Sequence, residues 1–501
     1  TFQIKEWLGV DKLLSLDAYK EYYGIDDIDS FLDVNFKVCR DVMCPANKDA
    51  DEPGAKFVGG NEHAVVTPDS FKNVYKTVMD AELGPQFGYR GEGKIPLCWY
   101  APILEMQSAA SPSIVMFWCL TQGAITVLHE FATKKQQDLF IPKLRTGEWG
   151  GTMGLTEPGA GSEVGAVKSR AVPTDVPGKY KLTGTKCFIS SGDHDLAENI
   201  IHLMLAKTPN AKEGTAGISL FIVPKFWVND DGSIGAWNDV TTMGIEHKLG
   251  IHGSTTATLS MGENDNCYGW MVGEAEVVDG RGIGMKQMFA YMNEERLNTG
   301  LFSLGCIGSA YYSALDYAKI RVQSKHSTNP KGPSVRIIEH EDVRRMLLSQ
   351  KSILEACRAL IYQSYLYRDL AVDAAAFVAN KKTDEFAAEF AMMADAMAAF
   401  KDIVDMNAAW TAGDKQMKQL YATRTLHAGA RVYCGKLLLD QALLAAAKLK
   451  GQGDVDVNFY KGKIATARFY IMNHVPDIFG YEKAMKCGDR SAIEIPEESF
   501  M

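Results

Sequence analysis

The sequence lacks an excess of basic residues. Lys and Arg together number 53 against 62 Asp and Glu, which gives a formal net charge of −9. A protein that grips nucleic-acid phosphates or an anionic membrane surface normally presents a basic patch. The charge balance gives no ground for either contact, so we expect no nucleic acid and no anionic membrane surface among the partners.

Long apolar runs are missing as well. No run approaches the roughly 20 apolar residues that a bilayer-spanning helix needs. The first residues, TFQIKEW, show no basic region followed by an apolar one, so no secretory signal is visible. We therefore expect no membrane span and a cytoplasmic protein.

Metal-binding patterns are absent too. The ten cysteines form no CxxC pair, and no second pair or histidine cluster near Cys39 and Cys44 completes a zinc site. No HExxH motif is present, which argues against a metal-dependent hydrolase. We expect free thiols in a reducing cytoplasm and no metal ion.

What is present is a change of pattern along 501 residues, which are too many for one simple core. Apolar residues follow helical spacing up to about residue 149 and again from about residue 284. Between them, short β-branched runs bounded by Gly and Asp predict an antiparallel β domain, because no helix-length crossover separates the runs. We predict an α+β multidomain protein with an N-terminal helical domain (1–149), a central β domain (150–278), a helical bundle (279–373) and an appended C-terminal helical domain (374–501).

The segment GTMGLTEPGAGS at 151–162 reads as a strand that runs into a tight turn. Gly159 and Gly161 have no Cβ, so a ligand could approach the backbone closely. Thr156 and Ser162 add hydroxyl groups beside backbone amides, which suits a phosphate or a polar ring edge. An ordinary turn between two strands is the alternative.

This segment resembles the flavin-binding strand of the acyl-CoA dehydrogenase family. The resemblance continues in the family's order through LTQGAITVLHEFATKKQQDLFIPKL, KLTGTKCFISSGDHDL, GISLFIVPKF and GIEHKLGIHGS. Within the family, the chain is most similar to large bacterial enzymes of the 3-methylthiopropanoyl-CoA dehydrogenase type, which carry an extra C-terminal helical domain. The resemblance implies an acyl-CoA substrate, non-covalent FAD, electron-transfer flavoprotein as the electron acceptor, and a homodimer or homotetramer.

The resemblance also implies roles for particular residues. Thr156 would bond the polar edge of the flavin, Phe188 would pack on its ring, and Ser190 would offer a hydroxyl to the reactive nitrogen. Ser162 would lie near the pyrophosphate and the bound thioester, and Arg321 would reach a neighbouring subunit's pyrophosphate. The cofactor-binding set that it implies is Leu155, Thr156, Gly161, Ser162, Phe188, Ile189, Ser190 and Arg321. The alternatives are a core position for Phe188, a solvated Arg321 and an ordinary turn at Ser190.

The catalytic base is the open question. Removing an α-proton from a thioester needs a carboxylate whose pKa is raised toward the working pH. Most family members carry it in a bundle segment resembling GGYGY…EYP, followed by EGT. The chain instead passes from LYRDLAVD into AAAFVANKKTDEF, so that segment is missing. A non-catalytic subunit that pairs with a complete partner chain is therefore the alternative function.

MNEERLNTG at 292–300 offers a second place for the base. A minority of the family places it in a glutamate-arginine pair on this earlier helix, and the match puts Glu295 at that position with Arg296 beside it. Adjacent helical residues do not face each other, so we expect Arg296 to orient substrate or a bundle partner instead. We expect Glu294 to be a surface acid, which is also the alternative for Glu295. The likeness to the subgroup favours a short or modified acyl chain.

Overall fold

The computed structural model describes residues 2–274, 277, 279–370, 384–451, 455–496 and 499. The chain forms two compact units. Val10–Cys306 make the N-terminal unit, and Thr1–Gly9 with Ile307–Met501 make the C-terminal unit. Helix α8, Gly284–Ile320, begins in the first unit and ends in the second.

The N-terminal unit begins with helices, as the apolar spacing predicts. Their ends follow local rules. In α7, Thr133 and Gln136 form a capping box at the start, and Gly147 ends the helix at a φ of 76°. The helices are α1 (Asp11–Leu14), α2 (Asp27–Val38), α3 (Cys44–Asp51), α4 (Asp69–Asp80), α5 (Leu97–Ala110), α6 (Pro112–Phe131) and α7 (Lys134–Thr146), with a π-helical turn at Cys39–Met43.

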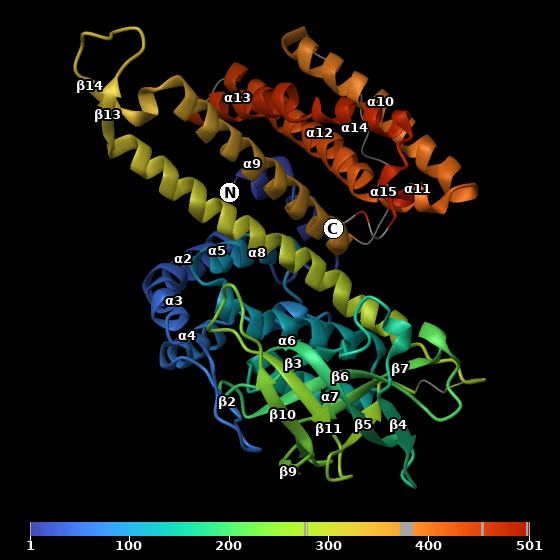
Figure 1. Cartoon of the computed structure of the whole chain (residues 1–501). Coiled ribbons are helices and arrows are strands. Elements are labelled where there is room, and N and C mark those ends of the chain that lie inside the picture. The colour runs from blue at the N-terminus through green and yellow to red at the C-terminus, as the bar shows by residue number, and fades with distance from the viewer. Residues whose placement is uncertain are drawn as a thin grey trace. The chain divides into compact units, whose positions relative to one another are not determined.

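A central sheet follows, in the order β10-β11-β5-β12-β7-β6-β3, with β4 joined to β5 and β6 (Figure 1). Its strands are β3 (Trp149–Gly154), β4 (Arg170–Pro173), β5 (Lys179–Ser190), β6 (Asn199–Lys207), β7 (Ile218–Pro224), β10 (Val240–Ile245), β11 (Thr256–Met261) and β12 (Tyr268–Met271). Two small hairpins lie outside it, β1 (Lys56–Phe57) with β2 (Val65–Val66), and β8 (Phe226–Val228) with β9 (Ile234–Trp237).

The predicted α+β architecture is confirmed, and one detail of the sheet differs. Strand β3 pairs with β6 in parallel, from Trp149 opposite Asn199 to Gly154 opposite Met204. The expectation of a purely antiparallel domain is wrong for this pair. The chain returns to the start of the sheet through β4 and β5 rather than through a helix, so the usual signal of a parallel pair is missing from the sequence.

Helix α6 packs on β3 so closely that the strand needs glycine. A Cβ on Gly151 would lie 2.6 Å from the Cβ of Ala124, and the Gly151 N–H donates to Thr121 Oγ1 at 3.0 Å. Among the described residues, α6 is the one helix long and apolar enough to cross a membrane, and 78% of that stretch is buried inside the protein. Its apolar surface is thus used in the core.

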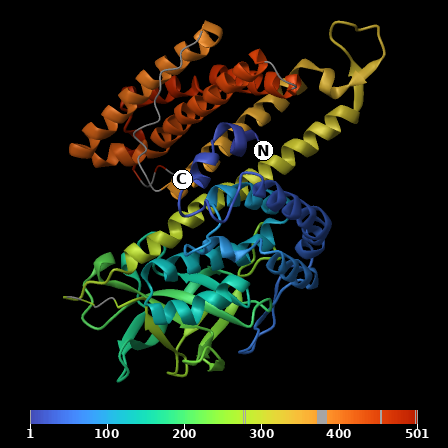
Figure 2. The ribbon, with the colours of Figure 1, turned by 180° about the vertical axis from the view of Figure 1, so that it is seen from behind.

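The C-terminal unit is helical. In both views its orange and red helices lie side by side (Figures 1 and 2). A hairpin of β13 (Val322–Lys325) and β14 (Ser334–Arg336) follows α8. The helices are α9 (Glu341–Leu370), α10 (Ala387–Ala412), α11 (Lys415–Leu420), α12 (Ala422–Lys450), α13 (Val457–Asn473), α14 (Asp477–Cys487) and α15 (Ser491–Glu494). The buried Lys463 pairs with Glu355 at 3.1 Å in this unit.

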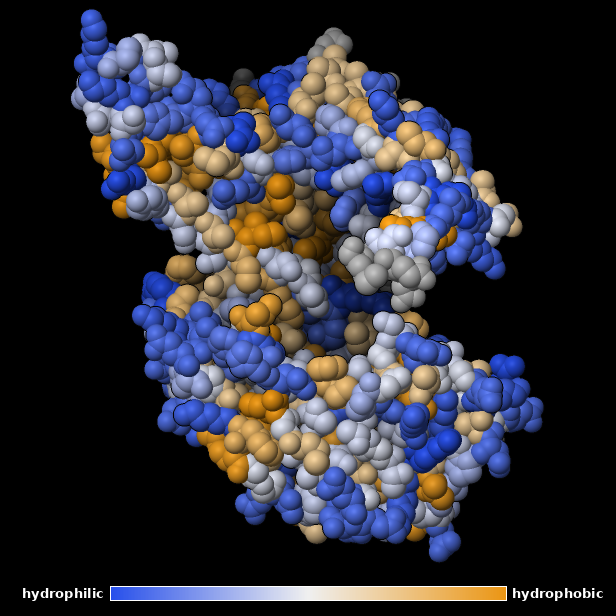
Figure 3. Space-filling view, viewed as in Figure 1, coloured by the Kyte–Doolittle hydropathy of each residue, from blue (hydrophilic) through white to orange (hydrophobic). Residues whose placement is uncertain are grey.

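The surface mixes hydrophilic residues with scattered apolar areas on the face that Figure 3 shows. At the C-terminal end of α8, Tyr312, Tyr317 and Ile320 are exposed. Single apolar residues at a surface are normal in monomeric proteins. They carry no assignment by themselves.

Candidate active site

The turn after β3 holds the predicted flavin segment. Backbone hydrogen bonds in both directions between Glu157 and Ala160, at 3.1 and 3.0 Å, close the turn. A Cβ placed on Gly159 or Gly161 would meet nothing within 4 Å, so both face open space. The carbonyl of Thr156 accepts the N–H of Cys187 at 2.9 Å, which ties the turn to β5. The turn is thus anchored on one side and open on the other.

Beneath the turn lies a buried ion pair that the sequence reasoning missed. Lys186 is fully buried, and its Nζ donates to Glu157 Oε1 at 2.8 Å and to the Leu155 carbonyl at 3.2 Å. Glu157 also accepts the Lys168 N–H and both the N–H and hydroxyl of Ser169. Burial lowers the pKa of Lys186, and the Lys186 charge and these hydrogen bonds outweigh burial to lower the pKa of Glu157.

A signal for Lys186 was present in the sequence. Side chains in a strand alternate between faces, so Leu182 and Lys186 share a face of β5. Leu182 is a core residue, and the same alternation buries the lysine. A charged residue on the inward face of a strand needs a partner, and Glu157 supplies it.

Phe188 lies at a bulge in β5. The pairing with β11 shifts register between Ala257 and Leu259, opposite Ile189 and Lys186. Phe188 has a φ of 61°, in the left-handed region that is strained for a bulky residue, and it is 61% exposed. The alternative that places Phe188 in the core is wrong. Such strain in a surface aromatic is typical of a functional site.

The other predicted flavin-binding residues of the turn and of β5 differ in how exposed their side chains are. Ser190 and Thr156 are half-buried and Ser162 is exposed, and none of the three hydroxyls has a hydrogen-bond partner among the described residues. The Ile189 side chain lies in the core, so only its backbone could meet a ligand. An exposed aromatic ring, free hydroxyls and an open glycine turn within one unit fit a flavin ring and its phosphates.

The other predicted cofactor residues are Leu155, which packs partly buried against the core, and Arg321. Arg321 belongs to the C-terminal unit, where it is exposed and donates to Gln323 at 3.2 Å. Its role at a neighbouring subunit stays a prediction.

Glu294 is not the surface acid that the sequence predicts. Its side chain is fully buried, and it accepts hydrogen bonds from Gln122 at 2.5 Å and Thr126 at 2.9 Å, both on α6. Arg90 Nη2 lies 3.4 Å from the same carboxylate. Helical spacing alone could not distinguish this buried acid from a solvated one, because its partners lie about 170 and 200 positions away in the sequence.

Glu295 is buried beside it, with 8% of its surface exposed. Burial first, and the Glu294 charge second, raise the pKa of Glu295 well above its usual value, against one hydrogen bond from Asn298 at 3.3 Å. After burial, the charge of Glu295 also contributes to raising the pKa values of Cys119 and Tyr291, which are buried nearby. The alternative of a surface acid is wrong for Glu295 also. A carboxyl with a raised pKa is the kind of group that general-base catalysis needs.

The raised pKa of Glu295 predicts a pH-dependent stability. The folded state keeps the Glu295 proton at pH values above 4.5, where the unfolded chain has released it. Stability contributed by this group therefore falls as the pH rises from about 4.5 toward the raised pKa. The free energy of unfolding of the Glu295→Gln variant, measured by urea unfolding across that range, should fall less steeply than that of the parent. An equal slope in both proteins would contradict the burial argument.

Arg296 lies on the exposed side of α8. Its Nη1 donates to Asn293 at 2.9 Å and its guanidinium lies 5.5 Å from the Phe289 ring centre. It forms no ion pair with Glu295 among the described residues. Contact with substrate stays a prediction.

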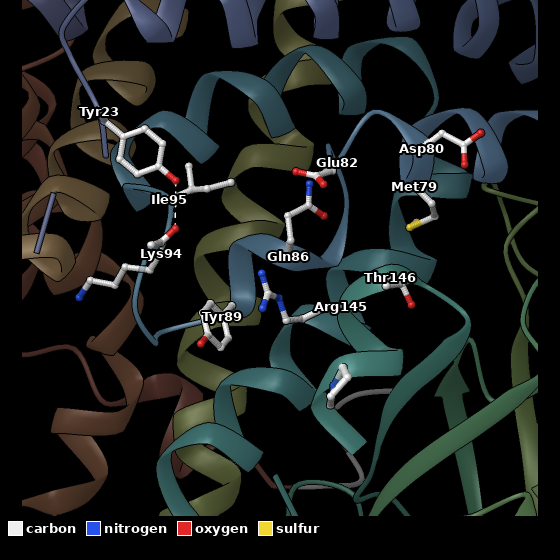
Figure 4. A pocket seen from close by; sticks show the side chains of 12 residues that line it. Tyr23, Met79, Asp80, Glu82, Gln86, Tyr89, Lys94, Ile95, Arg145 and Thr146 are labelled. Carbon is white, nitrogen blue, oxygen red and sulfur yellow. Dashed lines mark hydrogen bonds between the residues drawn. The ribbon is translucent and has the colours of Figure 1, made fainter. Parts of the chain in front are cut away.

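A separate cavity of about 580 Å³ is lined by residues of α4, of α7, of the turn at Pro85–Gly88 and of the loop that leads from this turn to α5. In Figure 4, Arg145 lies against Tyr89, and the guanidinium is 3.9 Å from the ring centre. The Tyr23 hydroxyl, at the edge of the cavity, donates to the Gly93 carbonyl at 3.0 Å. No predicted site residue lines this cavity.

Solved structures identify the fold. An acyl-CoA dehydrogenase complexed with FAD from Bacillus anthracis aligns with 95% of this chain and 90% of its own, with a TM-score of 0.69 and 16% identity. A butyryl-CoA dehydrogenase from Megasphaera elsdenii aligns with 92% of this chain and 98% of its own, with a TM-score of 0.55 and 18% identity. The fold is therefore that of the FAD-dependent acyl-CoA dehydrogenases.

The sequence comparisons give the family. Two butyryl-CoA dehydrogenases from Syntrophomonas wolfei are 57% and 58% identical, over all of this chain and 98% of each relative. A 3-methylmercaptopropionyl-CoA dehydrogenase from Ruegeria pomeroyi is 36% identical over 74% of this chain and 60% of its own. Family models match at 152–263 (acyl-CoA dehydrogenase, middle domain) and 370–496 (acetyl-CoA dehydrogenase C-terminal like). The chain belongs to the acyl-CoA dehydrogenase family, is an enzyme of that class, and uses FAD.

These alignments also agree with the predicted missing segment. The alignment to each Syntrophomonas relative extends over 597 positions, 96 more than the 501 residues of this chain. At least that many positions of the alignment thus have no residue here. The C-terminal family match begins at residue 370, where α9 ends.

Proposed function

We propose that this chain oxidises short-chain acyl-CoA thioesters, with butyryl-CoA as the preferred substrate, to the 2,3-enoyl-CoA and passes the electrons to electron-transfer flavoprotein. The observation that carries the proposal is 57% identity to a relative named butyryl-CoA dehydrogenase over the whole chain. The electron acceptor is inferred from the family alone.

Residues of the N-terminal unit have separate roles in the proposed reaction. Bound FAD would supply a hydride acceptor for the substrate's Cβ. Glu295 takes the proton from Cα, so that the C–H electrons form the new double bond as the hydride leaves. Its burial supports this role, because a desolvated carboxylate is a stronger base. Thr156 and Ser190 would orient the flavin edge through hydroxyls that have no hydrogen-bond partner within the described part of the chain.

A comparison of acyl chain lengths tests the substrate. The full chain, loaded with FAD and assayed with electron-transfer flavoprotein, should show a kcat/KM for butyryl-CoA at least about tenfold above that for octanoyl-CoA, since the proposed short-chain site would have to accept two extra C2 units. Equal values would reject short-chain specificity. No turnover with any acyl-CoA would reject the proposed activity.

Phe188→Ala tests the assigned flavin contact. Because Phe188 is mostly exposed, its loss should change the free energy of unfolding of the flavin-free protein by no more than about 0.5 kcal/mol. Loss of ring packing should weaken FAD binding by about tenfold, as measured by titration of flavin fluorescence. Val172→Ala, at an exposed apolar position on β4, is the control and should leave FAD binding unchanged. Unchanged binding in Phe188→Ala would remove Phe188 from the site.

We further propose a cytoplasmic homodimer or homotetramer. All ten cysteines are free, which fits a reducing compartment. The exposed guanidinium of Arg321 is available to a neighbouring subunit. Sedimentation of the purified chain with Arg321→Ala beside the parent measures both the oligomer and the effect of this residue.

A further inference from the structure

Burying the ion pair of Lys186 and Glu157 beneath the turn carries a large desolvation penalty. Removing an ammonium and a carboxylate from water carries a penalty of several kcal/mol for each ion, and well-packed apolar residues often stabilise a fold as well. Lys186 is nevertheless fully buried and Glu157 is 6% exposed. Stability alone does not account for a buried pair at this place in the fold.

The pair controls the geometry of one short segment. Lys186 Nζ holds the carbonyl of Leu155 at 3.2 Å, and the next carbonyl, of Thr156, is held by the Cys187 N–H at 2.9 Å. Glu157, the third residue in the row, is held by Lys186 itself. Three consecutive residues are thus tied to Lys186 or its neighbour, while no described residue forms a hydrogen bond with the Thr156 hydroxyl.

The same lysine lies two residues before Phe188 on β5. The bulge of β5 begins next to Lys186, at the register shift opposite Leu259. Lys186 therefore joins the turn that carries Thr156 to the strand that carries Phe188 and Ser190. These are the two segments that would hold the flavin ring.

We propose that Lys186 is a positioning residue for FAD, which fixes the turn at Thr156 relative to the bulge at Phe188 through Glu157 and the Leu155 carbonyl. Lys186 touches neither cofactor nor substrate. The inference rests on the proposed flavin site. It adds that the spacing of the flavin contacts is set by a buried charge behind them.

The test compares two buried lysines of the full chain. Lys186→Met keeps the length and apolar stem of the side chain and removes the charge. Lys463→Met does the same to the buried Lys463–Glu355 pair in the C-terminal unit. For each flavin-free protein, the FAD dissociation constant is measured by flavin fluorescence, and the thermal unfolding midpoint is measured with and without FAD.

Both variants should unfold at lower temperature than the parent without FAD. Lys186→Met alone should bind FAD at least about tenfold more weakly, the loss typical of groups that orient a binding residue, and should gain less in midpoint when FAD is added. Equal FAD affinity in Lys186→Met and the parent would overturn the proposal, and equal weakening in both variants would assign the effect to stability. If Lys186→Met does not fold, Glu157→Gln removes the same charge pair and should weaken FAD binding several-fold. A parent chain that binds no FAD would reject the flavin site itself.

Discussion

Replacing Glu295 by Gln is expected to lower the rate of butyryl-CoA-dependent flavin reduction by about 10²–10⁴-fold, the contribution of a positioned general base. Glutamine keeps the size of the side chain and cannot accept the α-proton. The carboxyl is buried and its pKa is raised, so its loss removes a base prepared for proton abstraction. Stopped-flow absorbance of the flavin, under anaerobic conditions, measures the reductive step alone.

Two comparisons make this result specific. Asp316→Asn removes an exposed acid on the same helix, α8, and should leave the rate unchanged. In the parent, the rate should rise with pH through the raised pKa of Glu295, because only the ionised carboxylate can take the proton. Near-normal turnover in Glu295→Gln would remove Glu295 from the reaction and leave the base unassigned.

Replacing Lys225 by Met is expected to destabilise the protein by about 3–5 kcal/mol, the usual effect of breaking a buried ion pair. Lys225 Nζ lies 2.5 Å from Asp193 Oδ1 and also donates to the Glu62 carbonyl. Asp193 is fully buried, and among the described residues Thr242 is the side-chain donor that would remain to it. Urea-induced unfolding, followed by tryptophan fluorescence, measures the loss.

Exposed and double variants separate the cause from general damage. Lys76→Met breaks the exposed pair of Lys76 with Asp80, which should matter by less than about 1 kcal/mol. Adding Asp193→Asn to Lys225→Met removes the unpaired charge and should recover part of the lost stability. A double variant that is less stable than Lys225→Met would contradict the unpaired-charge explanation.

Much of the fold follows from local pattern. The helix at Glu341–Leu370 lies within the predicted helical bundle (279–373), because apolar residues keep a helical spacing there. The parallel pairing of β3 with β6 could not be predicted, since strand polarity depends on the path of the chain rather than on the residues of the strand.

In the candidate site too, some features follow from local sequence and others depend on contacts between distant residues. The turn at Thr156 and the bulge at Phe188 lie in contiguous motifs that the sequence displays. The burial of Glu294 and Glu295 depends on packing against α6, whose residues Gln122 and Thr126 lie far away in the sequence. Helical spacing alone therefore assigned Glu294 to the surface. Lys186 is an intermediate case. It was not predicted, although strand alternation indicates its inward face, and its partner Glu157 is evident only in the structure.

The most direct measurement of the whole account is the visible spectrum of the full chain, loaded with FAD, during anaerobic titration with butyryl-CoA. We expect a bound-flavin band near one FAD per chain that bleaches as the thioester is added and does not bleach in Glu295→Gln. A chain that takes up no FAD, or a bound flavin whose absorbance persists in excess butyryl-CoA, would contradict the central claim.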